Sequence, residues 1–268
     1  MRKITAKTRL FDMIHRGEKP YGSMVSSIDP AVTDVMGEVG IDFVIIDSEH
    51  ARNGRVELEN HVRAANSHGM IPISRVHENR PALVQGHLDS GAHAIIVPHV
   101  DTAEDALTAV QAALYQPAGR RSMCPACYAG SYALDDWAEY AALANANVMI
   151  IPIIESVKAV ENIDEIFAVD GVDIVQFGPG DLSSDMGIPL RKDCPQMRAM
   201  WEKVYQAAAA AGKYVMAPPN LGFDEAHLVY DGLDFMMLRE LVKTNFRKHQ
   251  DAVARQSTAA PREPESVQ

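Results

Sequence analysis

Two carboxylates lie at the ends of apolar segments that are consecutive along the chain. Glu155 ends the segment 148–155, and Asp181 follows the segment 173–178. Two carboxylates, together with water and a chelating substrate, form a typical site for Mg²⁺ or Mn²⁺. A solvated glutamate and an ordinary turn are the alternatives for either residue alone. Placement on adjacent strands favours the metal, because a cation needs ligands that converge.

The turn before Asp181 could approach a bound anion closely. It reads Gly178-Pro179-Gly180, and glycine has no Cβ, so backbone N–H groups there can come near a substrate carboxylate. The same residues also make a good turn without any ligand. We predict that Gly178, Pro179 and Gly180 contribute to substrate binding.

Asp47, His50 and Arg75 have side chains suited to acid/base and electrostatic catalysis. His50 lies three residues after Asp47, close enough for a carboxylate to orient the imidazole and raise its basicity. Arg75 is a charge inside an apolar segment, and a buried charge needs a partner. A structural ion pair is one interpretation of Arg75, and stabilisation of a developing enolate or carboxylate is the other. Among the remaining histidines, which we expect to be structural or on the surface, His99 is the strongest catalytic alternative.

These residues require a scaffold of alternating strands and helices. Several strand segments are continuous apolar runs, which is typical of parallel strands covered on both faces. Eight of them, separated by helical periodicity, predict a single-domain α/β protein with a (β/α)8 TIM-barrel fold, whose catalytic groups project from the carboxyl ends of the strands. A doubly wound sheet is the fallback, although the first turn lacks GxGxxG. The predicted strands are 21–27, 42–47, 72–76, 94–100, 148–155, 173–178, 214–218 and 234–238.

Three segments lie outside this alternation. Residues 1–20 have the pattern of an amphipathic helix and not of a signal peptide. Residues 116–147 are expected to form a loop and an added helix at the carboxyl-end face of the barrel, where they would shape the site. Residues 257–268 are rich in Pro and Glu and are predicted to be disordered. The barrel domain is therefore assigned to residues 1–256.

Composition argues against two broad classes of function. The chain has 268 residues and a formal net charge of −11, whereas nucleic-acid binding needs a clustered basic surface. No apolar run reaches the roughly 18 residues of a membrane span, so we expect no membrane role. The three cysteines favour a reducing cytoplasm. Cys124 and Cys127 have the spacing of a redox or metal pair, but no second pair completes a zinc site, which favours buried or half-buried thiols.

Taken together, the motifs resemble those of the HpcH/HpaI class II pyruvate aldolases, a family of the phosphoenolpyruvate/pyruvate-binding barrel superfamily. The likeness spans most of residues 20–190 in the correct order. DSEH, a Glu that ends strand five and GP-x-DLS form a specific combination. The matching segments are GIDFVIIDSEHARN (40–53), ISRVHEN (73–79), HLDSGAHAIIVPHVDTAEDA (87–106), PAGRRS (117–122), IIESVKAVENIDEI (153–166) and GVDIVQFGPGDLSSDMG (171–187).

The resemblance implies a cofactor and an assembly. It implies that Glu155 and Asp181 bind a divalent metal, Mg²⁺, Mn²⁺ or Co²⁺, which chelates the carboxylate and ketone oxygens of pyruvate. A Lewis acid needs no Schiff-base lysine, and no predicted strand end offers one. The resemblance also implies a homo-oligomer in which the C-terminal helix packs on a neighbouring subunit, with dimers assembling further, often to hexamers.

The resemblance also implies roles for four other residues. Arg75 would stabilise the enolate, and His50, held by Asp47, would serve the acid/base steps. Asp89 matches an interface Asp that contributes near the site.

The sequence departs from the family pattern near the predicted site. Ile153 stands where the family commonly has Gln, two residues before Glu155 and on the same inward face, so one polar contact near pyruvate would be lost. Residues 127–128 replace a usual Arg-Ala, and 217–220 replace a Gly-led turn. Residues 238–240, taken as the end of strand eight, replace a Gly-Ser-Asp-like sequence. The metal and enolate machinery is intact, whereas the acceptor pocket is remodelled.

We therefore predict a divalent-metal-dependent aldolase or lyase. It would cleave a 4-hydroxy-2-oxo acid reversibly to pyruvate and an aldehyde through a metal-bound enolate, with oxaloacetate decarboxylation as a side activity. Another carbon–carbon lyase acting on a malate-like or acyl-CoA substrate is the first alternative. A catalytically silent barrel with a binding role is the second, and the departures at Ile153 and in strands seven and eight motivate it.

Overall fold

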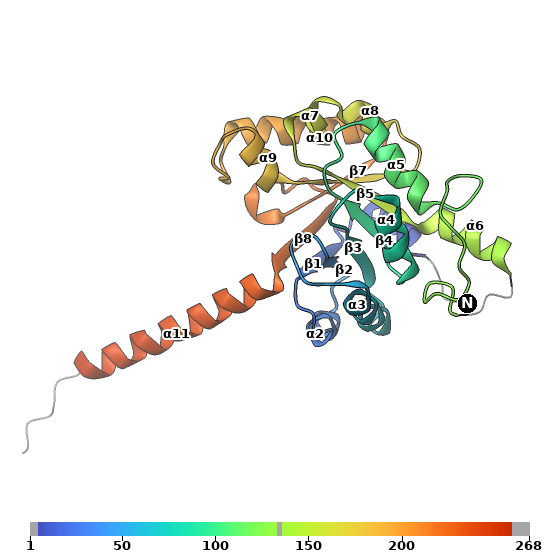
Figure 1. The fold of residues 1–268 in the computed structure, drawn as a ribbon. Coiled ribbons are helices and arrows are strands. Elements are labelled where there is room, and N and C mark those ends of the chain that lie inside the picture. The colour runs from blue at the N-terminus through green and yellow to red at the C-terminus, as the bar shows by residue number, and fades with distance from the viewer. Residues whose placement is uncertain (1–4, 133–135, 259–268) are drawn as a thin grey trace, which may run out of the picture.

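Eight parallel strands pair in chain order and close into a barrel in the computed structural model (Figure 1). Each strand pairs with the next along the chain, and β8 returns to pair with β1. The structure describes residues 5–132 and 136–258. The predicted barrel is confirmed. The strands are β1 (Tyr21–Val25), β2 (Phe43–Asp47), β3 (Ile71–Arg75), β4 (Ala94–Val97), β5 (Met149–Ile154), β6 (Ile174–Phe177), β7 (Tyr214–Ala217) and β8 (Leu228–Leu233).

Helices surround the barrel, and one of them closes its amino-terminal end. Ala6 and Leu10 of the first helix are buried among the side chains that fill the barrel. None of the helices in the described part of the chain is long and apolar enough to cross a membrane. The helices are α1 (Ala6–His15), α2 (Ala31–Val39), α3 (Arg55–Ser67), α4 (Pro81–Asp89), α5 (Ala103–Ala113), α6 (Trp137–Asn147), α7 (Val157–Glu161), α8 (Ile163–Phe167), α9 (Pro179–Asp185), α10 (Pro195–Ala211), η1 (Pro219–Leu221) and α11 (Asp234–Thr258).

The continuous apolar runs serve two cores, because alternate side chains of a strand point to opposite faces. Inward residues fill the barrel, and their neighbours pack against the helices. Burying each such side chain contributes roughly 1.5–3 kcal/mol, so the strands are held from both sides. The inward set includes Phe43, Ile45, Ile73, Ile96 and Ile151, and the outward set includes Val44, Ile46, Ile95 and Ile150.

The prediction of strand eight is wrong. The strand is Leu228–Leu233, and the predicted segment 234–238 is the first turn of α11. Asp234 accepts hydrogen bonds from the backbone N–H groups of Ser26 and Ser27 at 3.1 and 2.8 Å, which ties the start of α11 to the end of β1. Periodicity cannot separate a short apolar run of a strand from one of a helix. The predicted departure at 238–240 therefore does not lie at a strand end.

The placement of the excursion 116–147 is also corrected. It lies between α5 and β5 and contains α6. Because α5 runs back from the carboxyl end of β4, the chain that leaves it is at the opposite, amino-terminal end of the barrel. The excursion therefore does not shape the carboxyl-end face of its own barrel. Its thiols also differ from the prediction in part, since Cys124 is exposed and Cys127 is half-buried.

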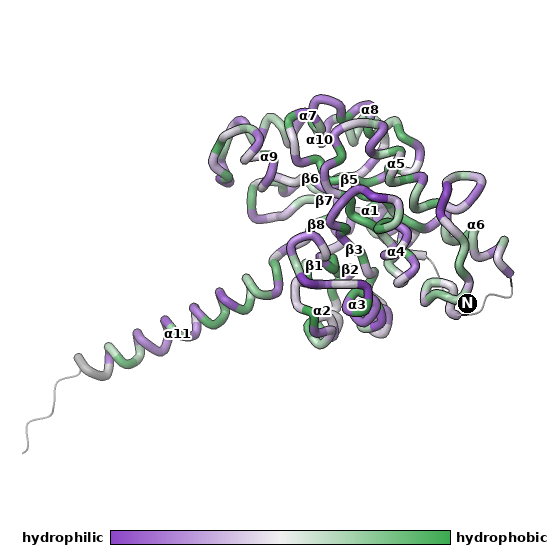
Figure 2. Tube along the Cα trace, viewed as in Figure 1, coloured by the Kyte–Doolittle hydropathy of each residue, from purple (hydrophilic) through white to green (hydrophobic). Residues whose placement is uncertain are grey.

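The final helix projects from the barrel and does not cover it (Figure 1). Its apolar side chains are exposed, and apolar residues recur along its length (Figure 2). The helix continues through Thr258, so the predicted irregular tail does not begin at residue 257. The rest of that tail, 259–268, lies outside the described residues, as do residues 1–4 of the predicted N-terminal helix. The exposed residues of α11 are Phe235, Met236, Met237, Leu238, Leu241, Val242, Phe246 and Val253.

Candidate active site

A buried ion pair joins the carboxyl ends of β2 and β3. Asp47 and Arg75 are partners in the register of these strands. The Nε of Arg75 donates to Asp47 Oδ1 at 2.9 Å, and its Nη2 lies 2.9 Å from Oδ2. The two side chains are only 12% and 1% exposed. Asn53 fixes the strand end, because its amide donates to the backbone oxygen of Asp47 at 2.9 Å. Arg75 therefore has the partner that its burial requires, and its direction is set by Asp47.

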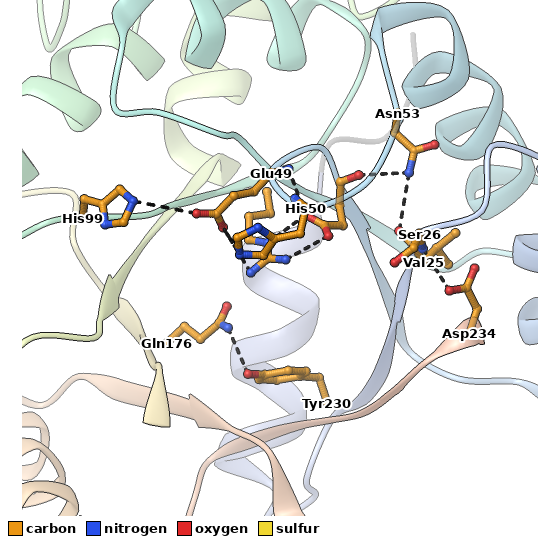
Figure 3. Close-up of polar contacts among 11 residues, drawn as sticks. Val25, Ser26, Glu49, His50, Asn53, His99, Gln176, Tyr230 and Asp234 are labelled. Carbon is orange, nitrogen blue, oxygen red and sulfur yellow. Dashed lines mark hydrogen bonds and ion pairs between the residues drawn. The ribbon is translucent and has the colours of Figure 1, made fainter. Parts of the chain in front are cut away.

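The predicted contact between Asp47 and the imidazole of His50 is not the one formed. Asp47 Oδ1 accepts from the backbone N–H groups of Glu49 and His50 at 2.9 and 3.4 Å. The imidazole Nε2 lies 3.9 Å from a carboxylate oxygen of Glu49, and its ring is exposed (Figure 3). Because the loop after β2 folds back so that its backbone N–H groups reach the Asp47 carboxylate, the side chain of His50 points away from Asp47. Asp47 positions the backbone of His50, and Glu49 faces its ring.

Glu49, to which the sequence assigned no role, also lies at this point of the site. Its carboxylate lies 3.1 Å from Nη1 of Arg75 and 3.9 Å from Nε2 of His99. The Glu49 side chain is only 10% exposed. Arg75 therefore contacts two buried carboxylates at once, and these partners raise the pKa of Arg75 against the opposing effect of burial.

Glu155 and His99 meet beside this cluster. The backbone N–H of His99 donates to Glu155 Oε1 at 2.7 Å, and the imidazole Nδ1 lies 3.3 Å from the same oxygen. His99 adopts a φ of +56°, a conformation uncommon for residues other than glycine. Burial raises the pKa of Glu155, and the negative charges of Glu49 and Asp181 raise it further, whereas His99 lowers it. His99, the strongest catalytic alternative among the remaining histidines, thus contacts the predicted metal ligand Glu155.

Asp181 approaches the cluster from the first turn of α9. It is exposed, and its charge acts on Glu155. Carboxylates 155 and 181 therefore come from successive strand ends, as the sequence predicted.

The two glycines of the predicted substrate-binding turn lie in different surroundings. The N–H of Gly178 donates to the backbone oxygen of Ile154 at 2.9 Å and is not free for a substrate. A Cβ at Gly178 would lie 2.7 Å from Ile153 Cγ2 and 2.8 Å from Glu155 Cβ, whereas a Cβ at Gly180 would meet nothing within 4 Å. Gly178 is therefore needed to make room for Glu155. Pro179 is buried at the start of α9.

A polar pair lies deeper in the barrel. Nε2 of Gln176 donates to the hydroxyl of Tyr230 at 3.0 Å (Figure 3). Gln176 is the register partner of Ile153, which is 2% exposed and part of the barrel core. Gln176 was not among the predicted site residues, although a polar residue in an apolar strand is the same signal that singled out Arg75.

Asp89 is not brought to this cluster within the chain. It ends α4, before β4 begins, and so lies at the amino-terminal end of the barrel. There it accepts from Nη2 of Arg121 at 2.8 Å, and its backbone oxygen accepts from Ala129.

The carboxylates of the cluster fit a divalent cation. Glu49, Glu155 and Asp181 bring three negative charges together, and Arg75 is engaged with Asp47 as well as Glu49. Burial is the main cause of the raised pKa of Glu155, and the charges of Glu49 and Asp181 add to it. No group of three or more His, Cys, Asp and Glu side chains in residues 5–132 and 136–258 is arranged to hold a metal by itself. Glu155 and Asp181 would therefore need oxygen ligands from water or a substrate, as hard cations commonly do.

A (β/α)8 barrel with carboxylates and a buried arginine at the carboxyl ends of its strands has the architecture of a TIM-barrel enzyme. The sequence profile of the HpcH/HpaI aldolase/citrate lyase family matches residues 21–221. The chain belongs to this family, and the predicted resemblance and the prediction of an aldolase-type lyase are confirmed.

Two curated relatives and one solved structure show how far the likeness extends. The chain is 34% identical to the hydroxypyruvate/pyruvate aldolase of Agrobacterium fabrum, over 82% of each chain. It is 33% identical to the 2-keto-3-deoxy-L-rhamnonate aldolase of Salmonella gallinarum, over 85% of this chain and 87% of that one. The HpcH/HpaI aldolase of Desulfitobacterium hafniense superposes with a TM-score of 0.84 at 31% identity, over 90% of this chain and 96% of that one.

Proposed function

We propose that this chain is a divalent-metal-dependent aldolase that reversibly cleaves a 4-hydroxy-2-oxo acid to pyruvate, or a similar 2-oxo acid, and an aldehyde. The single observation that carries the proposal is the cluster at the carboxyl ends of β2, β3 and β5, where a fixed guanidinium faces an excess of carboxylates. The names of the two curated relatives, both aldolases, support a 2-oxo acid as the product.

Glu155 and Asp181 would hold the cation, which we propose to be Mg²⁺, Mn²⁺ or Co²⁺. When bound, a divalent cation acts as a Lewis acid toward a carbonyl group. Glu155 is 7% exposed and is oriented by the backbone N–H of His99, so one of its two oxygens is already engaged and the other is directed by that contact. Asp181, on an exposed turn, adapts to the ion more freely.

Arg75 would stabilise the negative charge that develops on the 2-oxo acid. Three contacts engage its guanidinium, two with Asp47 and one with Glu49. Only the contact of Nε with Asp47 Oδ1 is a hydrogen bond, and the oxygens at the other two contacts have no hydrogen-bond partner among the described residues. The N–H donors of Nη1 and Nη2 can therefore serve the carboxylate or enolate oxygen of the substrate. The carboxylates hold these donors in place before the substrate arrives, which is how electrostatic stabilisation becomes effective.

His50 would serve as the base for cleavage. It takes the proton of the 4-hydroxyl group, the bond between carbons 3 and 4 breaks, and the electron pair moves to the 2-oxo group to give the enolate. The aldehyde leaves, and a proton delivered to carbon 3 completes the 2-oxo acid. The exposed ring of His50 suits proton exchange with water. His99, whose ring is also exposed and contacts Glu155, is the second candidate for the base.

A coupled assay tests this proposal. A 4-hydroxy-2-oxo acid is incubated with the EDTA-treated protein and each metal, and the pyruvate released is measured with lactate dehydrogenase. We expect metal-dependent release, about 10²–10⁴-fold slower in His50→Gln and little changed in His77→Gln, a control histidine outside the cluster. A loss in His99→Gln with activity kept in His50→Gln would move the base to His99. No release with any metal would contradict the proposal.

We also propose that the chain works as a homo-oligomer in which α11 packs on a second copy. The exposed apolar side chains of α11, with Val35 and Val39 of α2, form an apolar surface larger than single scattered residues explain. Light scattering of Phe246→Asp should show a smaller species than the wild-type protein, and equal masses would contradict the proposal. The place of Asp89 in a neighbouring site depends on this assembly.

We propose a cytoplasmic location as well. The three free cysteines, one of them exposed, suit a reducing compartment.

A further inference from the structure

The barrel holds a buried acceptor that nothing in the described residues satisfies. Gln176 of β6 is 3% exposed. Its Nε2 donates to the Tyr230 hydroxyl at 3.0 Å, whereas its Oε1 is buried without a hydrogen-bond partner among the residues that the structure describes. Leaving a buried carbonyl unpaired is unfavourable. A donor from outside the protein, on a ligand or a water molecule, would relieve that cost.

The acceptor lies in the part of the barrel on which the catalytic groups act. Gln176 is the register partner of Ile153, which is two residues from Glu155 and therefore shares its face of β5. The charges of Arg75 and Glu155 both act on the phenol of Tyr230. In Figure 3 the amide oxygen of Gln176 is turned away from Tyr230 and toward the side where Glu49 and His50 lie.

The chemistry of this oxygen restricts what it can recognise. An amide Oε1 only accepts hydrogen bonds, and so do the carboxylate and keto oxygens of a 2-oxo acid. Pyruvate therefore has no group that can donate a hydrogen bond to Oε1 of Gln176. A hydroxyl group on carbon 3, beside the reacting bond, is a donor. The 4-hydroxyl of the uncleaved substrate is a donor too, but its proton must pass to the base during cleavage.

We propose that Gln176 is a specificity-determining residue that accepts a hydrogen bond from a 3-hydroxyl group, so that the site takes a 3-hydroxy-2-oxo acid in preference to pyruvate as the nucleophile. The inference rests on the proposed aldolase function. Tyr230 positions Gln176, because its hydroxyl holds Nε2 and thereby turns Oε1 toward the site. Ile153 of β5 is apolar where the family commonly has Gln, and its register partner on β6, Gln176, places an amide at the same level of the barrel.

Exchange of carbon-3 hydrogen for deuterium isolates this half of the reaction, since no aldehyde or 4-hydroxyl is present. Hydroxypyruvate and pyruvate are incubated separately in D2O with the metal-loaded protein, and label uptake is measured by mass spectrometry against an enzyme-free blank. We expect a higher kcat/KM for hydroxypyruvate. Gln176→Leu should lower that value about tenfold, as loss of one neutral hydrogen bond does at the upper end, and should change the value for pyruvate less than twofold.

Two more variants guard the interpretation. Met216→Leu changes the apolar register partner of Gln176 on β7 and should leave the ratio of the two kcat/KM values unchanged. Tyr230→Phe keeps the amide but removes its anchor, and should lower the ratio about threefold even if Gln176→Leu does not fold.

Each other outcome contradicts a different statement. Equal losses with both 2-oxo acids in Gln176→Leu would make the residue structural and overturn the inference. An unchanged ratio would mean that water satisfies Oε1, which also overturns it. Exchange with neither compound in the wild-type protein would overturn the proposed function, and the inference with it.

Discussion

Asp47→Asn should lower both the stability of the fold and the rate of catalysis, although the two side chains have nearly the same shape. Asp47 is 1% exposed and receives Arg75 through two contacts of 2.9 Å. An asparagine keeps Oδ1 for the backbone donors of Glu49 and His50, but it places an NH₂ group against Nη2 of Arg75. Two donors then face each other in a buried site, and the guanidinium keeps only the hydrogen bond from Nε to Oδ1.

The magnitude follows from what remains. Removing one partner of a buried ion pair costs about 3–5 kcal/mol. Glu49 still lies 3.1 Å from Nη1 of Arg75, so we expect the lower end, about 3 kcal/mol of unfolding free energy. The matched control is Glu225→Gln, which breaks a contact of 2.6 Å to Arg198 between side chains that are each 41% exposed. Exposed pairs contribute about 0–1 kcal/mol.

Urea unfolding followed by circular dichroism, at one protein concentration, measures both variants. Aldol cleavage by the folded variant is measured in parallel, and we expect a loss of about 10²–10³-fold for Asp47→Asn. A loss of stability no larger than that of Glu225→Gln would refute the argument from burial. Lost stability with full activity would refute the argument that Asp47 directs a catalytic Arg75.

Three further predictions concern Gly178, His87 and Glu155. Gly178→Ala should lower the unfolding free energy by about 1–3 kcal/mol and reduce activity, because the new Cβ lies 2.8 Å from that of Glu155; Gly180→Ala, where the space is open, is the control, and equal effects in urea unfolding would contradict the packing argument. Burial lowers the pKa of His87 from 6.5 to about 4. Between pH 4 and pH 6.5 the imidazole is therefore protonated in the unfolded chain and neutral in the folded chain. Stability should therefore be fully present above pH 6.5 and fall by about 3 kcal/mol toward pH 4; His87→Gln should flatten this part of the urea-derived pH profile, and an unchanged slope would count against the assignment. Glu155→Gln should abolish metal-dependent turnover while the circular dichroism spectrum stays unchanged, and turnover that survives would show that Glu155 is not a metal ligand.

Strand order and most strand positions could be predicted because parallel strands buried on two faces are long apolar runs. The exception is the segment 234–238. Its apolar residues lie on α11 and are exposed. Their hydrophobicity therefore belongs to an exposed helix face and does not indicate a strand. Closure of the barrel instead uses Leu228–Leu233, a run whose Asp and Gly lower its apparent strand character.

The site was predictable to the extent that strand ends determine it. Asp47 and Arg75 end their strands and Glu155 directly follows β5, and the topology alone brings them to one face. Glu49 and His99 follow strands in loops, where side-chain direction depends on backbone angles such as the φ of +56° at His99. No local sequence pattern predicts a positive φ at a histidine.

Asp89 shows the limit of reasoning from a motif. Its match to an interface residue gave no position relative to the other site residues. In the structure Asp89 ends α4, at the amino-terminal end of the barrel and opposite the carboxyl ends of the strands. There it pairs with Arg121.

Oxaloacetate decarboxylation tests the central claim most directly, because loss of CO₂ from this 2-oxo acid generates the pyruvate enolate without an aldehyde partner. The protein is stripped with EDTA, shown to be folded by circular dichroism, and resupplied with Mg²⁺, Mn²⁺ or Co²⁺. We predict that at least one metal restores decarboxylation in the wild-type protein and that none restores it in Glu155→Gln. Folded wild-type protein that stays inactive with every metal would contradict the account.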